Sequence, residues 1–150
     1  MKRSQMLLLL MSLVGILSAS CTPDQATTND ISETVFRYQF GHKADIYCIG
    51  LGRGSDPTSD FLKRFENNIP PVKKYSDCKT TDNLGDRFRD KTGKTVIFYF
   101  VYSVQRSIWG TATVEASWDI APLWGESHRY TIKRINEKWT VTDDELTSVS

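Results

Sequence analysis

The chain has 150 residues, with 19 lysines and arginines against 18 aspartates and glutamates, a formal net charge of +1. This balance lacks the strongly basic character typical of nucleic-acid-binding proteins, so no nucleic-acid partner is expected. The length fits one domain that is large enough to bury a hydrophobic core, and it excludes a second domain of ordinary size.

Residues 1–20 have the pattern of an export signal. Lys2 and Arg3 form a basic head, residues 6–17 are apolar, and small residues follow at 18–20. The apolar stretch is shorter than the roughly 20 residues that span a bilayer. We therefore predict a signal peptide that is removed rather than a transmembrane anchor.

Residues 17–21 (LSASC) resemble the lipobox of bacterial lipoproteins, which ends at the cysteine that receives the lipid. The resemblance implies a mature protein that begins at an acylated Cys21 and is anchored in the bacterial cell envelope. Thr22 after the cysteine is similar to an outer-membrane sorting signal, which would place the domain in the periplasm. Ser18 stands where the family usually has leucine, valine or isoleucine. Ordinary cleavage, giving a soluble protein with a free Cys21, therefore stays an alternative.

Cys48 and Cys78 remain once Cys21 is assigned to the lipid. An even pair in an oxidising compartment favours a disulfide. Closing a loop of about 30 residues would stabilise the fold by roughly 3 to 4 kcal/mol in the chain-entropy model. Two buried free thiols are the alternative. A metal site with His42 or His128 is not expected, since no C-x2-C or H-x3-H cluster is present, and no cofactor is expected.

Residues 21–29 are predicted to form a polar tether, because this segment shows no helical periodicity. The folded domain is then expected to cover residues 30–150. Asp30 and Glu33 fit a D-x-x-E capping box at the start of an amphipathic helix. Gly41 is the expected end of that helix.

Four further segments are expected before the C-terminal half. Residues 45–51 are apolar and too short for a helix, which predicts a strand. Asp56 is the expected N-cap of a second helix, with Pro57 at its first position. Residues 72–78 are interpreted as a short edge strand, and residues 79–94 as a charged loop.

The C-terminal half has the period of two that is typical of strands. Residues 95–104 are apolar on both faces and predict a central strand, whose second face would be covered by a homodimer contact or by the preceding loop. Residues 127–135 and 138–142 are expected to pair across Asn136 and Glu137. Residues 108–120 alternate, and six side chains are expected to face inward: Ile108, Gly110, Ala112, Val114, Ala116 and Trp118.

These elements predict an α+β fold, with one or two N-terminal helices packed on a curved antiparallel sheet of about four to six strands and a C-terminal meander. Their order resembles the nuclear-transport-factor-2-like (cystatin-like) α+β roll. That resemblance implies a curved sheet around helices, a mouth that can hold a small ligand, and dimerisation through the outer sheet face. The fold alone does not establish a function.

Residues 50–54 (GLGRG) lie between a predicted strand and a predicted helix, which is the context of a phosphate-binding loop. No Gly-Lys-Ser/Thr follows, and the Asp56 carboxylate at the helix start opposes an anion. A tight turn that uses the conformational freedom of glycine is the favoured interpretation.

His128 with Asp119 is a candidate acid and base pair for a cavity enzyme of the isomerase or dehydratase kind. A rim or hydrogen-bonded core histidine is the favoured alternative. Trp109 and Trp124 are candidate exposed contacts for a partner. The basic residues of segment 129–138 would either face anionic lipid or block pairing at a sheet edge.

The sequence therefore predicts a non-enzymatic envelope protein with a binding or assembly role, whose bilayer contact runs through Cys21. A cavity enzyme and a purely structural periplasmic protein are the competing classes. No residue pattern identifies a specific partner or ligand.

Overall fold

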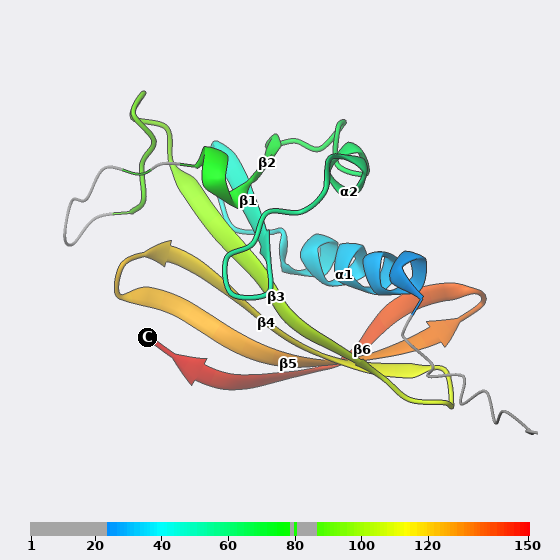
Figure 1. Cartoon of the computed structure of the whole chain (residues 1–150). Coiled ribbons are helices and arrows are strands. Elements are labelled where there is room, and N and C mark those ends of the chain that lie inside the picture. The colour runs from blue at the N-terminus through cyan, green and yellow to red at the C-terminus, as the bar shows by residue number, and fades with distance from the viewer. Residues whose placement is uncertain (1–23, 79, 81–86) are drawn as a thin grey trace, which may run out of the picture.

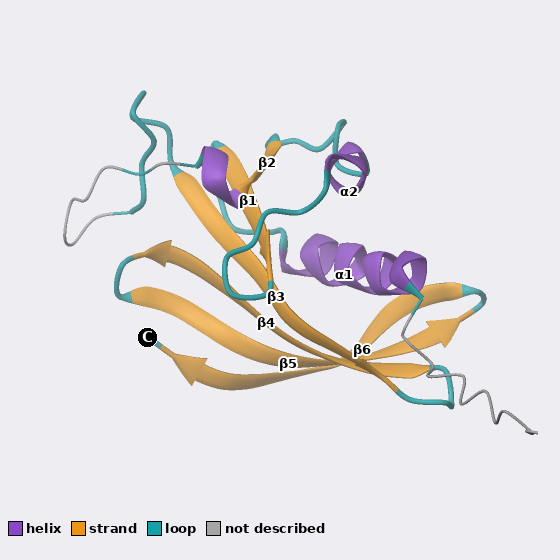
Figure 2. Ribbon diagram, viewed as in Figure 1, coloured by secondary structure: helices purple, strands orange, loops and turns teal. Residues whose placement is uncertain are grey.

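The computed structural model describes residues 24–78, 80 and 87–150. Its fold is α+β, with one long helix lying across one face of a six-stranded sheet (Figures 1 and 2). The predicted signal peptide and Cys21 lie outside the described residues. The elements in chain order are α1 (Gln25–Gln39), β1 (Ile46–Leu51), α2 (Ser59–Lys63), β2 (Val72–Lys74), the 3-10 helix η1 (Tyr75–Asp77), β3 (Val96–Arg106), β4 (Thr111–Ala121), β5 (Trp124–Ile135) and β6 (Lys138–Val149).

The sheet is mixed and open, in the order β2-β1-β3-β4-β5-β6. Strand β1 runs parallel to both β2 and β3, so the expectation of a purely antiparallel sheet is wrong at this end. The long connection between β1 and β3 lets the chain return to the same end of the sheet, as a parallel pair requires. The predicted meander is confirmed for β3 to β6, and Asn136 and Glu137 form its last turn with φ of 48° and 64°.

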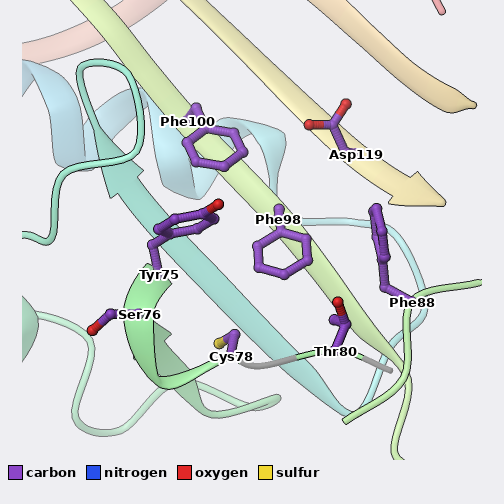
Figure 3. Close-up of a pocket in the computed structure, with 8 residues that line it drawn as sticks. All are labelled: Tyr75, Ser76, Cys78, Thr80, Phe88, Phe98, Phe100 and Asp119. Carbon is purple, nitrogen blue, oxygen red and sulfur yellow. The ribbon is translucent and has the colours of Figure 1, made fainter. Parts of the chain in front are cut away.

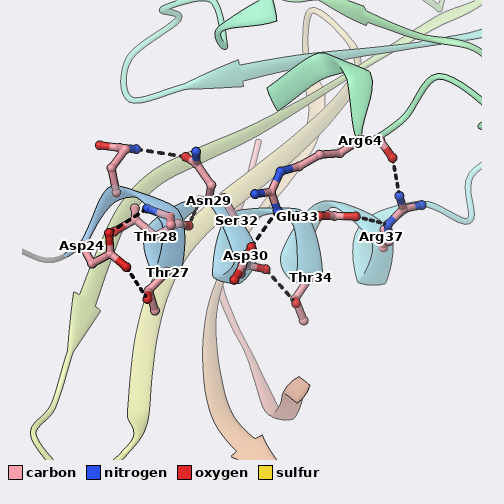
Figure 4. A network of polar contacts seen from close by, with 12 residues as sticks. Asp24, Thr27, Thr28, Asn29, Asp30, Ser32, Glu33, Thr34, Arg37 and Arg64 are labelled. Carbon is pink, nitrogen blue, oxygen red and sulfur yellow. Dashed lines mark hydrogen bonds and ion pairs between the residues drawn. The ribbon is translucent and has the colours of Figure 1, made fainter. Parts of the chain in front are cut away.

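Helix α1 begins earlier than predicted, so residues 25–29 are helical and do not form a tether. Asp24 is the N-cap, and its side chain accepts a hydrogen bond from the Ala26 amide at 3.2 Å. Asp30 and Glu33 lie within the helix, where both pair with Arg64 at 2.7 and 2.9 Å (Figure 4). These carboxylates therefore join α1 to the segment after α2 and do not form a capping box.

The start of α2 also differs from the prediction. Thr58 is the N-cap, and its hydroxyl accepts a hydrogen bond from the Phe61 amide at 3.2 Å. Asp56 instead accepts hydrogen bonds from the Ser76 amide at 2.8 Å and the Ser76 hydroxyl at 2.6 Å. The expected cap thus fastens η1 to the chain that leaves β1.

Strand β3 is covered on both faces, as predicted. On one face, Ile31, Val35 and Phe36 of α1 pack against a core that includes Tyr99. On the other face, a smaller cluster forms around Phe98; its members are Ile46, Cys48, Cys78, Val96 and Phe98, with Phe88 and Phe100 packed against it. The described chain itself supplies the cover of the second face, through η1 and the segment that carries Phe88.

A disulfide joins Cys48 of β1 to Cys78, the residue after η1, which confirms the predicted pairing. The two residues are 30 positions apart, and their Cα atoms lie 6.2 Å apart. The bridge is buried in the smaller cluster and attaches η1 to the sheet. A disulfide is compatible with an extracytoplasmic compartment.

The inward face of β4 is confirmed from Ala112 to Ala116, but the prediction is wrong for Ile108 and Gly110. Ile108 is 91% exposed and Gly110 has a φ of 71°, because both lie in the turn between β3 and β4. The small side chains of Ala112 and Ala116 belong to the same core as α1, which agrees with the close approach of a helix.

Candidate functional site

An aromatic cleft of about 560 Å³ lies on the face of the sheet away from α1 (Figure 3). We call it the aromatic cleft below. Strand β3, η1 and the segment before β3 contribute its apolar surface, and β4 contributes one carboxyl group. Its lining residues are Tyr75, Ser76, Cys78, Thr80, Phe88, Phe98, Phe100 and Asp119.

Phe98 and Phe100 form the base of the aromatic cleft, and the rings of Phe88 and Tyr75 form its sides. Phe98 and Phe100 are alternate residues of β3, and their ring planes are inclined by only 13° with centroids 6.3 Å apart. Phe88 stands at 83° to Phe98 with centroids 5.1 Å apart, and Tyr75 stands at 64° with centroids 5.6 Å apart. A ligand in the cleft would therefore meet ring faces from more than one direction.

The glycines of segment 50–54 make room for these rings. A β-carbon at Gly50 would lie 2.8 Å from the Phe100 ring, and one at Gly54 would lie 3.4 Å from the Tyr75 ring. Gly52 and Gly54 have φ of 59° and 88°. The tight-turn interpretation is confirmed, but no sequence pattern indicates that Gly50 and Gly54 make room for aromatic side chains.

Asp119 lies beside Phe98 across the β3–β4 pair, on the same side of the sheet (Figure 3). Burial raises the pKa of its carboxyl above the ordinary 3.8, and no cation of the described ranges opposes that shift. Among the described residues, no hydrogen bond or ion pair reaches this carboxyl group. The cleft therefore holds an acidic group that has no counter-charge among the described residues.

The predicted pairing of His128 with Asp119 is wrong, because the two side chains lie on opposite faces of the sheet. His128 is opposite Ala116, whereas Asp119 is opposite Gly125. Successive residues of a strand alternate between faces. Ala116 and Asp119 are an odd number of positions apart and so point to different sides.

His128 instead lies between two other carboxylates. Its Nδ1 is 2.6 Å from Asp144 Oδ1, and its Nε2 is 3.1 Å from Glu126 Oε2. Both ring nitrogens are therefore in contact with carboxyl groups of the same fold, and neither is directed toward a bound substrate.

His42, in the turn after α1, lies near this group. Its ring packs on Trp118 with centroids 4.0 Å apart. Desolvation lowers the pKa of His42, and nearby Arg87 and His128 add to that shift while Glu126 opposes it. Within the described residues, no group of three or more histidine, cysteine or acidic side chains is placed to hold a metal ion.

Trp109 and Trp124 are 83% and 68% exposed, and they lie at opposite ends of β4. Trp109 is in the turn before the strand, and Trp124 is the first residue of β5 after it. They do not form one surface, so a partner that used both would have to span the strand. No helix in the described ranges is long and apolar enough to cross a membrane.

The fold and site define an α+β protein with an open mixed sheet and an aromatic, acid-containing cleft on the face away from its helix. Comparison of the chain with models of protein families, with curated proteins and with solved structures finds no match. The function proposed next rests on the chemistry of the chain's own residues.

Proposed function

We propose that this is a non-enzymatic, lipid-anchored protein of the bacterial cell envelope that binds a cationic ligand in the aromatic cleft. The lipobox-like residues 17–21 support the anchor at Cys21. The disulfide between Cys48 and Cys78 supports an oxidising compartment. The cleft supports a binding role.

The observation that carries the ligand class is Asp119 beside Phe98. The face of an aromatic ring has a negative quadrupole and attracts cations. Asp119 adds a negative charge when it is ionised, and it has no positive partner among the described residues. A ligand with a positively charged group on a small apolar body would satisfy both features.

The size and construction of the cleft agree with small-molecule binding. Its volume of about 560 Å³ lies within the usual range of roughly 300 to 1,000 Å³ for such sites. Half of the described lining residues are aromatic and one of them is charged, and such a composition is typical of sites that select a ligand by shape and charge.

Catalysis is less well supported than binding. The Ser76 hydroxyl donates to Asp56, but hydrogen bonds from Ser76 lower the pKa of that carboxyl, which makes it a weak base for activating a nucleophile. His128 lies on the other face with both ring nitrogens engaged. Among the described lining residues Asp119 is the one acid, and none of the others would complete a proton transfer with it as a second acid or base.

A matched pair of ligands tests the proposal on the oxidised mature protein. Choline carries a quaternary ammonium group, and 3,3-dimethylbutan-1-ol is its neutral isostere. In NMR titrations we expect choline to shift the signals of cleft residues with at least about tenfold higher affinity than the alcohol, a difference of 1.4 kcal/mol. Asp119→Asn should remove this preference, whereas Asp143→Asn, which changes an exposed carboxylate of β6, should preserve it.

The two titrations distinguish ligand binding by the cleft from selection of the ligand by its charge. If neither compound shifts the cleft signals, the binding role is wrong. If both bind equally, the cleft binds apolar ligands and the role of Asp119 is wrong. The intact mass of the mature chain tests the anchor, because a Cys21 without a diacylglyceryl group would contradict it.

A further inference from the structure

Three segments meet at one end of the sheet: the start of α1, the turn between β3 and β4, and the turn between β5 and β6 (Figure 1). The Arg134 amide of β5 donates to the carbonyl of Gly110 in the first turn, at 3.2 Å. Asp30 of α1 lines a shallow cleft together with Glu137 and Lys138 of the second turn. We call this region the helix-start end.

Apolar side chains are exposed at the helix-start end. Ile108 is 91% exposed, Trp109 is 83% exposed and Ile135 is 46% exposed. The turn that carries the first two is internally bonded, because the Ser107 amide donates to the Thr111 carbonyl at 2.9 Å. The Trp109 amide also donates to the Ser107 hydroxyl at 3.2 Å. The turn therefore holds both side chains away from the core.

Basic side chains surround this apolar tip. All four lie on exposed strand ends and, in the described part of the chain, none forms an ion pair. They are Arg106, Lys133, Arg134 and Lys138. Glu137 is the acid in the adjacent turn, while Asp30 and Glu33 are already paired with Arg64. The helix-start end thus combines exposed apolar groups with unpaired positive charge.

The proposed anchor lies next to the same end. Helix α1 has its N-cap at Asp24, three positions after Cys21. Three extended residues reach at most about 10 Å. A lipid on Cys21 would therefore hold the start of α1 close to the membrane surface.

We propose that the helix-start end docks on the bilayer, with Ile108 and Trp109 inserted at the boundary of headgroups and acyl chains. Tryptophan favours this region because its ring is apolar and its N–H is polar. The four basic side chains would then face anionic headgroups, which attract basic residues close to the membrane surface. This inference rests on the proposed anchor at Cys21.

The proposed docking orients the aromatic cleft relative to the membrane. Phe98 and Ile108 are ten positions apart along and beyond β3, which corresponds to roughly 30 Å in an extended strand. With the tip of the β3–β4 turn in the membrane, the cleft lies toward the far end of the domain and is open to ligands from the aqueous side.

Tryptophan quenching tests the docking on the purified full mature protein in vesicles of phosphatidylethanolamine and phosphatidylglycerol with brominated acyl chains. We expect Trp109→Phe to remove most of the quenched emission, because the reporter is lost while an apolar residue stays. Trp124→Phe, at the opposite end of β4, is the matched control and should leave the quenching unchanged. Ile108→Asp should lower the quenching of Trp109 at least twofold.

The quenching result is interpreted together with the intact mass of the mature chain, which shows whether Cys21 is lipidated. A lipidated protein without quenching at Trp109 contradicts the docking and leaves the anchor intact. An unlipidated protein that is quenched when vesicles are added contradicts the anchor and supports the docking surface. An unlipidated and unquenched protein contradicts both. Equal losses for Trp109→Phe and Trp124→Phe would also contradict the docking.

Discussion

Gly125 of β5 lies directly opposite Asp119 of β4, and a β-carbon at Gly125 would overlap the Asp119 carboxylate. The same β-carbon would lie 2.8 Å from the Trp118 carbonyl oxygen. Asp119 therefore has its position in the aromatic cleft only because the opposing residue has no side chain.

Gly125→Ala should displace the Asp119 carboxylate and strain the β4–β5 pair. We expect choline affinity to fall by about tenfold, or 1.4 kcal/mol, together with a lower melting temperature. Gly41→Ala is the matched control, because a β-carbon there meets nothing within 4 Å. Unchanged choline binding in Gly125→Ala would show that the carboxylate position does not matter.

Asp119 should make the protein less stable as the pH rises. Its pKa is raised by burial, so the folded state holds the proton more tightly than the unfolded chain. The resulting stabilisation is present below 3.8, the ordinary pKa, and is lost as the pH rises through the higher folded pKa. Asp119→Asn should therefore raise the free energy of unfolding at neutral pH while it weakens choline binding.

Urea unfolding across the acidic to neutral range measures this effect. The difference in stability between Asp119→Asn and the unsubstituted protein should grow as the pH rises. A constant difference would mean that the Asp119 carboxyl does not titrate differently on folding. Choline affinity should change in the same direction as this difference: it should rise as the pH rises and fall as Asp119 becomes protonated.

The disulfide should contribute roughly 3 to 4 kcal/mol to the free energy of unfolding in the chain-entropy model. Urea unfolding with and without a reductant measures this contribution. In the double variant Cys48→Ala, Cys78→Ala, the reductant should have no further effect. A stability that is unaffected by reduction would mean that the packing of the smaller cluster alone holds η1.

His128→Ala should destabilise the β5–β6 pair by about 1 to 3 kcal/mol, because it leaves two carboxyl groups without their hydrogen-bond partner. The partners are Asp144 and Glu126, at 2.6 and 3.1 Å. Choline binding in the aromatic cleft should be unchanged, since His128 is on the other face. Loss of choline binding with preserved stability would show that His128 takes part in ligand binding.

Strand β4 was predictable because its buried and exposed residues alternate locally, and β1 and β3 were predictable because they are short apolar runs. The first residue of α1 could not be predicted in the same way, because Asp24 and Asp30 are both suitable N-cap residues. The choice depends on Arg64, which is 34 positions from Asp30 and 31 from Glu33. Contacts at that distance in sequence leave no local pattern.

Individual residues of the candidate site were predicted from the sequence, but their arrangement in space was not. Asp119 was chosen for its chemistry, but its partner depends on which face it shares. A register shift between Asp119 and Ala121 separates the alternation of β4 from that of β5. The pairing of Asp119 with Phe98 further depends on how β3 and β4 align. The acylation of Cys21 and the likeness to the nuclear-transport-factor-2-like roll stay predictions.

Cys78 directly follows η1, which carries the Tyr75 side of the aromatic cleft. The bond to Cys48 forms and persists only where thiols are oxidised. In newly made chains in a reducing cytoplasm, the disulfide would therefore not yet attach this side of the cleft to β1. Ligand capture would begin only after the chain reaches its destination, and cytoplasmic ligand would not be carried out with it.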